Sequence, residues 1–144
     1  MIQKLFIAIL ALQTLTFGET LSVKVIDART GGGVPGREVQ LQLWDVHSGR
    51  YEMRDMLRAN TDQNGVAAFH LPVPLPHDVI AMLNFGNWAR CAFAERHSTD
   101  NVLLHGAVEG ASCGEKNIQV HPDPGMLYLF ARPRTFWESL KRIP

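Results

Sequence analysis

Apolar and polar side chains alternate along much of the chain. Residues 21–25 read LSVKV and residues 39–43 read VQLQL, and in both stretches every second residue is apolar. A period of two places one set of side chains on the buried face of a strand and the other set in water. Both stretches are therefore predicted to be strands that cover a core with one face.

Further strand-like runs follow at intervals typical of a β-sandwich, and turn-rich stretches separate most of them. The chain is therefore predicted to be all-β, an immunoglobulin-like or prealbumin-like sandwich of about seven strands. The other candidate strands are residues 51–57, 66–71, 79–85, 88–94, 102–108, 116–120 and 126–132. Residues 50–60 have a second interpretation as a helix, because Met53, Met56 and Leu57 fall at helical spacing.

Two local signals divide these strands. The Asn64-Gly65 pair in TDQNG is expected to supply the positive φ angles of a tight turn between two strands. Prolines 72, 74 and 76 in LPVPLP are expected to form a stiff extended connector, because proline removes a backbone donor and fixes φ.

The first eighteen residues differ from the rest. Lys4 precedes an uncharged apolar run, and the segment ends at the small residue Gly18. This layout predicts a secretory signal peptide at residues 1–18, with an uncleaved anchor or a buried first helix as alternatives. The protein is then exported to a periplasmic or extracellular location, with a sandwich domain at 19–133 and a tail at 134–144. In such an oxidising compartment, Cys91 and Cys113 are expected to form a disulfide.

The tail RTFWESLKRIP changes the pattern from strand to helix. Phe136, Trp137, Leu140 and Ile143 could share one face of a short amphipathic helix in a basic segment. One expectation is that the aromatic side chains pack on the sandwich. The alternative is a segment that docks on a partner or contacts a membrane surface.

Charge and local motifs exclude several functions. The formal net charge is zero, which argues against a nucleic-acid binder. GGGVPG at 31–36 matches a dinucleotide-binding motif, but a strand follows it where the motif needs a helix, so a turn is expected. GASCG at 110–114 resembles a nucleophile elbow without the required context. The six histidines form no closely spaced pair, so no metal site is expected. The motifs supply no convergent catalytic set either, so no cofactor and no catalytic residues are expected.

Two segments together resemble a known family. LSVKVIDARTGGGVPGREVQLQLWD, followed later by ANTDQNGVAAFHLP, is similar to the carboxypeptidase regulatory-like modules of exported bacterial proteins, within the prealbumin-like (transthyretin-like) group. The resemblance covers residues 21–72 and implies a sandwich that serves as an accessory domain. The enzymes of this group, the hydroxyisourate hydrolases, carry a first-strand histidine and a C-terminal Tyr-Arg-Gly-Ser. Here Lys24 stands in that strand and the tetrapeptide is missing.

These observations predict a non-catalytic exported module that contacts a protein partner in the cell envelope or supports its structure. A binder of carbohydrates or other small ligands is the alternative, since aromatic rings offer flat apolar faces to sugars. A transthyretin-like hydrolase comes third. The residues expected to contact a partner or ligand are Trp44, Tyr51, Trp88, Phe136 and Trp137.

Overall fold

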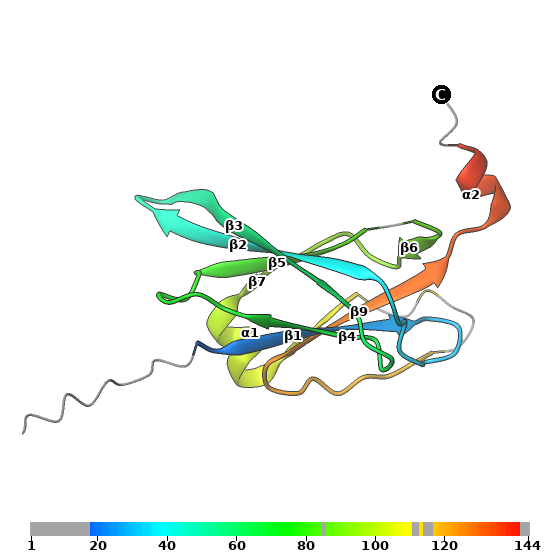
Figure 1. The fold of residues 1–144 in the computed structure, drawn as a ribbon, viewed down its shortest axis with the longest axis horizontal. Helices are drawn as coiled ribbons and strands as arrows, with labels where there is room; N and C mark the ends of the chain where they lie inside the picture. Colours follow the sequence, from blue (N-terminus) through cyan, green and yellow to red (C-terminus); the bar gives the residue numbers. More distant parts are fainter. Residues whose placement is uncertain (1–17, 85, 111–112, 114–116, 142–144) are drawn as a thin grey trace, which may run out of the picture.

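Two β-sheets packed face to face form the body of the molecule (Figure 1). The computed structural model describes residues 18–84, 86–110, 113 and 117–141. Residues 1–17 of the predicted signal peptide therefore lie outside the described part of the chain. The predicted all-β sandwich is confirmed.

The first sheet has the strand order β4-β1-β9-β6, and β8 also pairs with β9. The second sheet has the order β3-β2-β5-β7. The first sheet contains β1 (Thr20–Asp27), β4 (Val66–His70), β6 (Trp88–Arg90), β8 (Ala107–Glu109) and β9 (Met126–Pro133). The second contains β2 (Glu38–His47), β3 (Arg50–Asn60), β5 (Asp78–Leu83) and β7 (Arg96–Ser98).

The core lies between the two sheets and is built from the alternating positions. Leu21 and Val23 of β1 face Val39, Leu41 and Leu43 of β2 in one buried cluster. Each such side chain contributes on the order of 1.5–3 kcal/mol when it leaves water. The alternation in the sequence therefore identifies the inner face of both sheets correctly.

The described chain has nine strands, and three expectations need correction. Residues 50–60 form strand β3, so the helical alternative is wrong. Residues 102–108 were expected to be a strand, but 99–105 form helix α1 (Thr99–His105), and the following strand is β8. The Ser98 side chain accepts a hydrogen bond from the Asn101 N–H and begins this helix. Residues 117–120 are not in a strand, although a strand was expected there.

The turn at Asn64-Gly65 also differs from the expectation. Only Gly65 of the pair has positive φ (79°), and the turn leads from β3 in one sheet to β4 in the other. The Asp62 carboxylate shapes it by accepting hydrogen bonds from the N–H groups of Asn64 and Val66. The stretch GGGVPG is a turn, as expected, with φ values of 79° at Gly31 and 66° at Gly36.

Strands β1 and β9 run parallel in adjacent positions, from Ser22 beside Met126 to Asp27 beside Ala131. Parallel neighbours begin at the same end of a sheet, so the start of β1 and the end of β9 lie at opposite ends. Figure 1 accordingly shows the first described residues and helix α2 (Phe136–Leu140) at the two ends of the long axis. No helix within the described ranges is long and apolar enough to cross a membrane.

Candidate interaction surface

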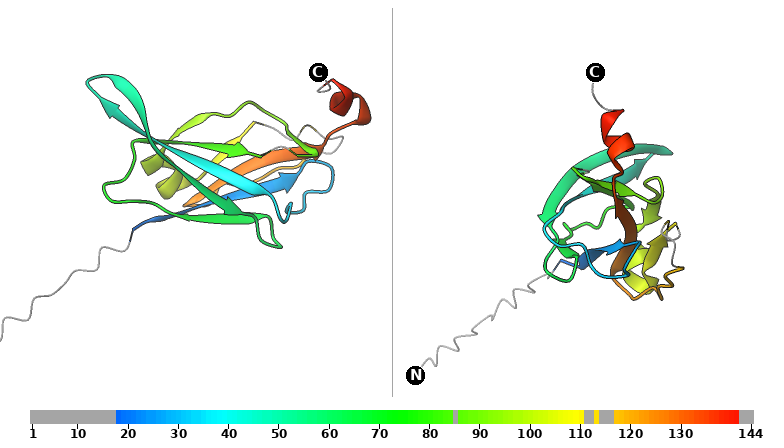
Figure 2. Two further views of the ribbon diagram at one scale, coloured as in Figure 1. Left: turned by 45° about the horizontal axis from the view of Figure 1, so that its top comes forward. Right: turned by 90° about the vertical axis from the view of Figure 1, so that its right-hand side faces the viewer.

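The outer face of the second sheet carries two of the predicted contact residues side by side. Trp44 of β2 pairs with Met53 of β3, and Val46 pairs with Tyr51, so these side chains share one face of the hairpin. Tyr51 is 48% exposed and Met53 is 49% exposed. We call the group formed by Trp44, Tyr51, Met53 and Arg96 the hairpin patch. Figure 2 shows that the β2–β3 hairpin which carries it extends beyond the rest of the sandwich.

Arg96 of β7 holds the aromatic side chains of the hairpin patch in place. Its guanidinium carbon lies 3.7 Å from the ring centroid of Tyr51 and 5.3 Å from that of Trp44. A cation over an aromatic face contributes about 0.5–2 kcal/mol, depending on solvent exposure. The guanidinium also occupies one face of the Tyr51 ring, which a sugar could otherwise use for stacking. This geometry favours contact with a protein over contact with a carbohydrate.

A β-bulge and an ion pair fix the direction of the hairpin. Leu43 pairs with Asp55 and Trp44 pairs with Met53, which leaves Arg54 as the extra residue on β3. Arg54 makes a bidentate ion pair with Asp45, with N–O distances of 2.6 and 2.7 Å. This guanidinium lowers the pKa of Asp45. Arg54 also donates to the carbonyl of Pro74, so the hairpin is tied to the proline-rich connector.

Trp88 lies apart from the hairpin patch. It belongs to β6 in the first sheet, is half-buried and packs against the main core cluster. The guanidinium carbons of Arg29 and Arg37 lie 5.9 and 5.7 Å from its ring centroid. We therefore assign Trp88 a packing role beside its predicted role as a contact residue.

Phe136 and Trp137 of α2 project from the end of the molecule opposite the hairpin patch (Figure 1). They are 69% and 72% exposed, and their rings make an edge-to-face contact with centroids 5.6 Å apart. The expectation that the tail packs its aromatic side chains on the sandwich is wrong. Figure 2 shows α2 standing away from both sheets, on the side of the second sheet. Docking on a partner or a membrane remains the prediction for this segment.

The orientation of α2 is set by hydrogen bonds around Glu138. Its carboxylate accepts from the backbone N–H of Thr135, and the Thr135 hydroxyl accepts from the N–H of Glu138, which is a capping box. Arg132 donates twice to the same carboxylate, at 3.0 and 2.5 Å. The ion pair with Arg132 lowers the pKa of Glu138 to about 2. Helix α2 is thus anchored by its polar side while its aromatic side chains face solvent.

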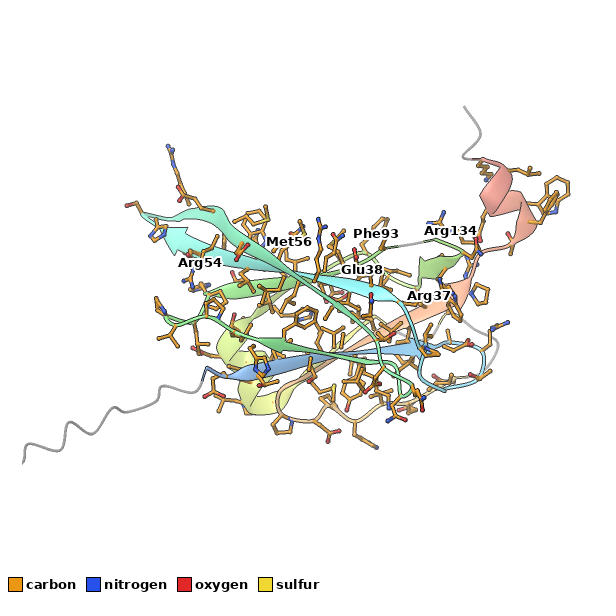
Figure 3. The ribbon with its side chains drawn as sticks, viewed as in Figure 1. Arg37, Glu38, Arg54, Met56, Phe93 and Arg134 are labelled. Carbon is orange, nitrogen blue, oxygen red and sulfur yellow. A yellow bond between two sulfur atoms is a disulfide. The ribbon has the colours of Figure 1, made fainter. Side chains whose placement is uncertain are left out.

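An apolar pocket of about 350 Å³ opens where the chain leaves β6 and passes beside β5. Phe93 at this pocket is 95% exposed. Figure 3 shows Phe93 on the same side of the molecule as Met56, which pairs with Gln42 in the second sheet. The pocket is lined by Met82, Arg90, Cys91, Ala92, Phe93 and Ala94.

Beneath the pocket lies a charged network that joins the two sheets. Arg90 of the first sheet donates to the Glu109 carboxylate and to the carbonyl of Ala81 in the second sheet. His97 of the second sheet places Nε2 3.0 Å from Glu109 Oε1. Glu109 is 2% exposed, and its charge is balanced by Arg90. Burial lowers the pKa of His97; the negative charge of Glu95 partly opposes this shift, and the positive charge of Arg90 adds a smaller lowering.

The contacts of this network are those of a structural link between the two sheets more than those of a catalytic site. Its three side chains are bound to one another and to a backbone carbonyl, and the polar atoms of Glu109 face the interior. Within the described part of the chain, no group of three or more His, Cys, Asp or Glu side chains is placed to hold a metal ion. The second cavity, about 330 Å³, lies instead at the base of the hairpin among polar side chains such as Asp45, His77 and Asp100.

The predicted disulfide is confirmed: Cys91 and Cys113 are bonded, with their Cα atoms 5.3 Å apart. It ties the chain after β6 to the segment after β8, next to the apolar pocket.

Comparison with protein-family models gives no match, and a search among curated proteins gives none either. The case for function therefore depends on the geometry of this chain.

The structure thus distributes the five predicted contact residues over three places. It brings Trp44 and Tyr51 together, it brings Phe136 and Trp137 together, and it leaves Trp88 in a packed position. Sequence reasoning missed Arg96 and the Arg90–Glu109–His97 network. No local pattern marks these residues, because their partners come from strands that become neighbours only in the folded chain.

Proposed function

We propose that this protein is a non-catalytic, exported β-sandwich module that binds a protein partner in the cell envelope through the hairpin patch. The observation that carries the proposal is the exposure of Tyr51 and Met53 on a hairpin whose direction is fixed by Arg54 and Asp45. A preorganised apolar surface loses little conformational entropy when it binds.

The composition of the hairpin patch supports a protein partner. Trp, Tyr, Met and Arg are enriched in the centres of protein interfaces, and Lys is depleted there. The hairpin follows this bias, since residues 38–60 contain three arginines and no lysine. The Cys91–Cys113 disulfide supports export, because disulfides persist in oxidising compartments.

Site-specific photocrosslinking in intact cells tests this proposal. A photoreactive amino acid at Met53 is expected to give a discrete adduct with one protein. The same amino acid at His70, an exposed residue of β4 in the first sheet, is the matched control and is expected to give none. Tyr51→Ser should abolish the adduct at Met53 while the protein stays folded and disulfide-bonded. Identical adducts from both positions, or none from Met53, would contradict the proposal.

The carbohydrate-binding alternative rests on one observation, the polar cavity at the base of the hairpin beside Asp45 and His77. Carboxylates and imidazoles there could accept and donate hydrogen bonds to sugar hydroxyl groups. Titration calorimetry with envelope glycans separates the two functions. Heat of binding that is lost in Asp100→Asn and kept in Tyr51→Ser would favour the glycan over the protein partner.

A further inference from the structure

The chain presents both an exposed apolar group and an apolar pocket, in separate places. Phe136 and Trp137 on α2 are exposed to solvent at one end of the molecule. The pocket between Met82 and residues 90–94 is open and mostly apolar. Both features lie outside the hairpin patch, so an inference from them stands apart from the proposed function.

The tail of a given chain points away from the pocket of that same chain. Strands β6 and β9 are antiparallel, with Trp88 beside Pro133 and Arg90 beside Ala131. The residues after Arg90 lead to the pocket, whereas the residues after Pro133 lead in the opposite direction to α2. The capping box at Thr135 and the ion pair between Arg132 and Glu138 keep α2 in this orientation, directed away from the pocket. Any α2 that fills the pocket comes from another copy.

The pocket has the size and chemistry of a site for one large aromatic side chain. Its volume of about 350 Å³ lies near the lower end of the range of ligand pockets, roughly 300–1,000 Å³. The one charged residue in the lining, Arg90, is paired with Glu109, so its charge is already compensated. The disulfide at Cys91 fixes one wall, which reduces the entropy lost when a ring enters.

Charge complementarity favours the same pairing. Lys141 directly follows α2, and Glu95 directly follows the pocket residue Ala94. When the α2 aromatic side chains of one copy meet the pocket of another, Lys141 approaches the segment after Ala94, where Glu95 is exposed and the guanidinium of the next residue, Arg96, lies over the Tyr51 ring. Such rim charges speed and orient association more than they strengthen it.

We propose that Trp137, with Phe136 beside it, inserts into the pocket of a second copy of this chain. The contact is heterologous, because one copy offers α2 and the other offers the pocket. The copy that offers α2 keeps a free pocket and the copy that offers the pocket keeps a free α2, so the contact propagates into open chains or closes into rings. A small surface of this kind associates transiently and gains most of its affinity from the one buried aromatic anchor.

The test uses the full exported protein with its disulfide intact, studied by analytical ultracentrifugation between about 10 µM and 1 mM, where small interfaces associate. The wild-type mass is expected to increase with concentration. The tail variant, Phe136→Ser with Trp137→Ser, and the pocket variant, Ala94→Glu, should each associate at least about tenfold more weakly. Leu104→Ser, at a 67% exposed position on α1, is the matched control and should associate like the wild type.

Mixing the two defective variants gives the decisive result. The tail variant keeps a working pocket and the pocket variant keeps a working tail, so an equimolar mixture should form a 1:1 heterodimer and nothing larger. A wild-type protein that stays monomeric throughout would overturn the inference, as would a mixture that stays monomeric. A monomer that instead binds anionic phospholipid vesicles through Trp137 would also overturn it, and would assign α2 to a lipid surface. The crosslinking at Met53 has a separate readout, so its outcome does not depend on this one.

Discussion

A Cβ atom added to Gly33 would lie 1.9 Å from the carbonyl oxygen of Asn64. The two turns that define the beginning of the sandwich, GGGVPG and TDQNG, are thus in direct backbone contact. Val25 connects them, since its N–H donates to Gly65 and its carbonyl accepts from Val34. Thr61 adds a buried link, because its hydroxyl donates to the Val34 carbonyl at 2.7 Å.

Gly33→Ala should therefore destabilise the protein strongly. The obstructing atoms belong to the backbone of Asn64 and Gly65, so one turn must move to admit the methyl group. We expect a loss of about 2–4 kcal/mol in the free energy of unfolding, measured by urea denaturation. Gly32→Ala is the control, because its added Cβ meets only the Thr30 hydroxyl at 3.4 Å. Equal effects of the two substitutions would show that the turns are not in contact.

The sequence predicts which residues form strands better than it predicts which strands pair with one another. Alternation at residues 39–43 identifies the buried face of β2, because a period of two depends only on one strand. The parallel pairing of β1 with β9 has no such local signal, since the two strands come from opposite ends of the chain. Helix α1 was missed because VLLH is too short for its periodicity to separate a helix from a strand.

The candidate interaction surface could likewise be predicted only in part from the sequence. Tyr51 and Trp44 could be selected from the sequence as aromatic residues on predicted strands. Their common contact with Arg96 could not be predicted, because it requires the order β3-β2-β5-β7. The exposure of Trp137 depends on the hydrogen bonds of Glu138, and the tail pattern fits both a packed and an exposed helix. The signal peptide and the family resemblance remain predictions.

The Arg90–Glu109 pair should behave as a buried ion pair. Arg90→Met leaves the buried Glu109 carboxylate without its guanidinium partner and with only the His97 imidazole beside it, and we expect a loss of about 3–5 kcal/mol in the free energy of unfolding. Arg90→Met combined with Glu109→Gln removes both charges and should recover most of this loss. Thermal and urea unfolding of the two variants provide the measurement. A double variant no more stable than Arg90→Met would contradict the pairing.

The disulfide should stabilise the sandwich by restricting the unfolded chain. Cys91 and Cys113 are separated by 22 residues, and closing a loop of that length contributes about 3 kcal/mol in the chain-entropy model. Cys91→Ser with Cys113→Ser should lower the free energy of unfolding by about that amount. Dithiothreitol should destabilise the wild type and leave the double variant unchanged. An equal response of both proteins to the reductant would show that the bond does not stabilise the fold.

His97 should make stability depend on pH below neutrality. Burial, and to a smaller extent Arg90, lowers the pKa of His97 in the folded protein, while Glu95 opposes this shift. The unfolded chain, with a histidine pKa near the ordinary value of about 6.5, therefore binds a proton more readily than the folded one. The stabilising contribution is present above that pH and is lost as the pH falls toward the folded-state pKa of His97.

Urea denaturation between about pH 7 and pH 5 measures this slope, since stability changes with the difference in bound protons. His97→Gln keeps a donor for Glu109 but cannot titrate, so its stability should vary less over the range than that of the wild type. Glu95→Gln removes the charge that favours the imidazolium and should make the loss steeper. An unchanged slope in His97→Gln would contradict the prediction, because carboxylates such as Asp27 and Asp45, whose pKa values their arginine partners lower, affect stability only near and below the unfolded-state pKa of about 4.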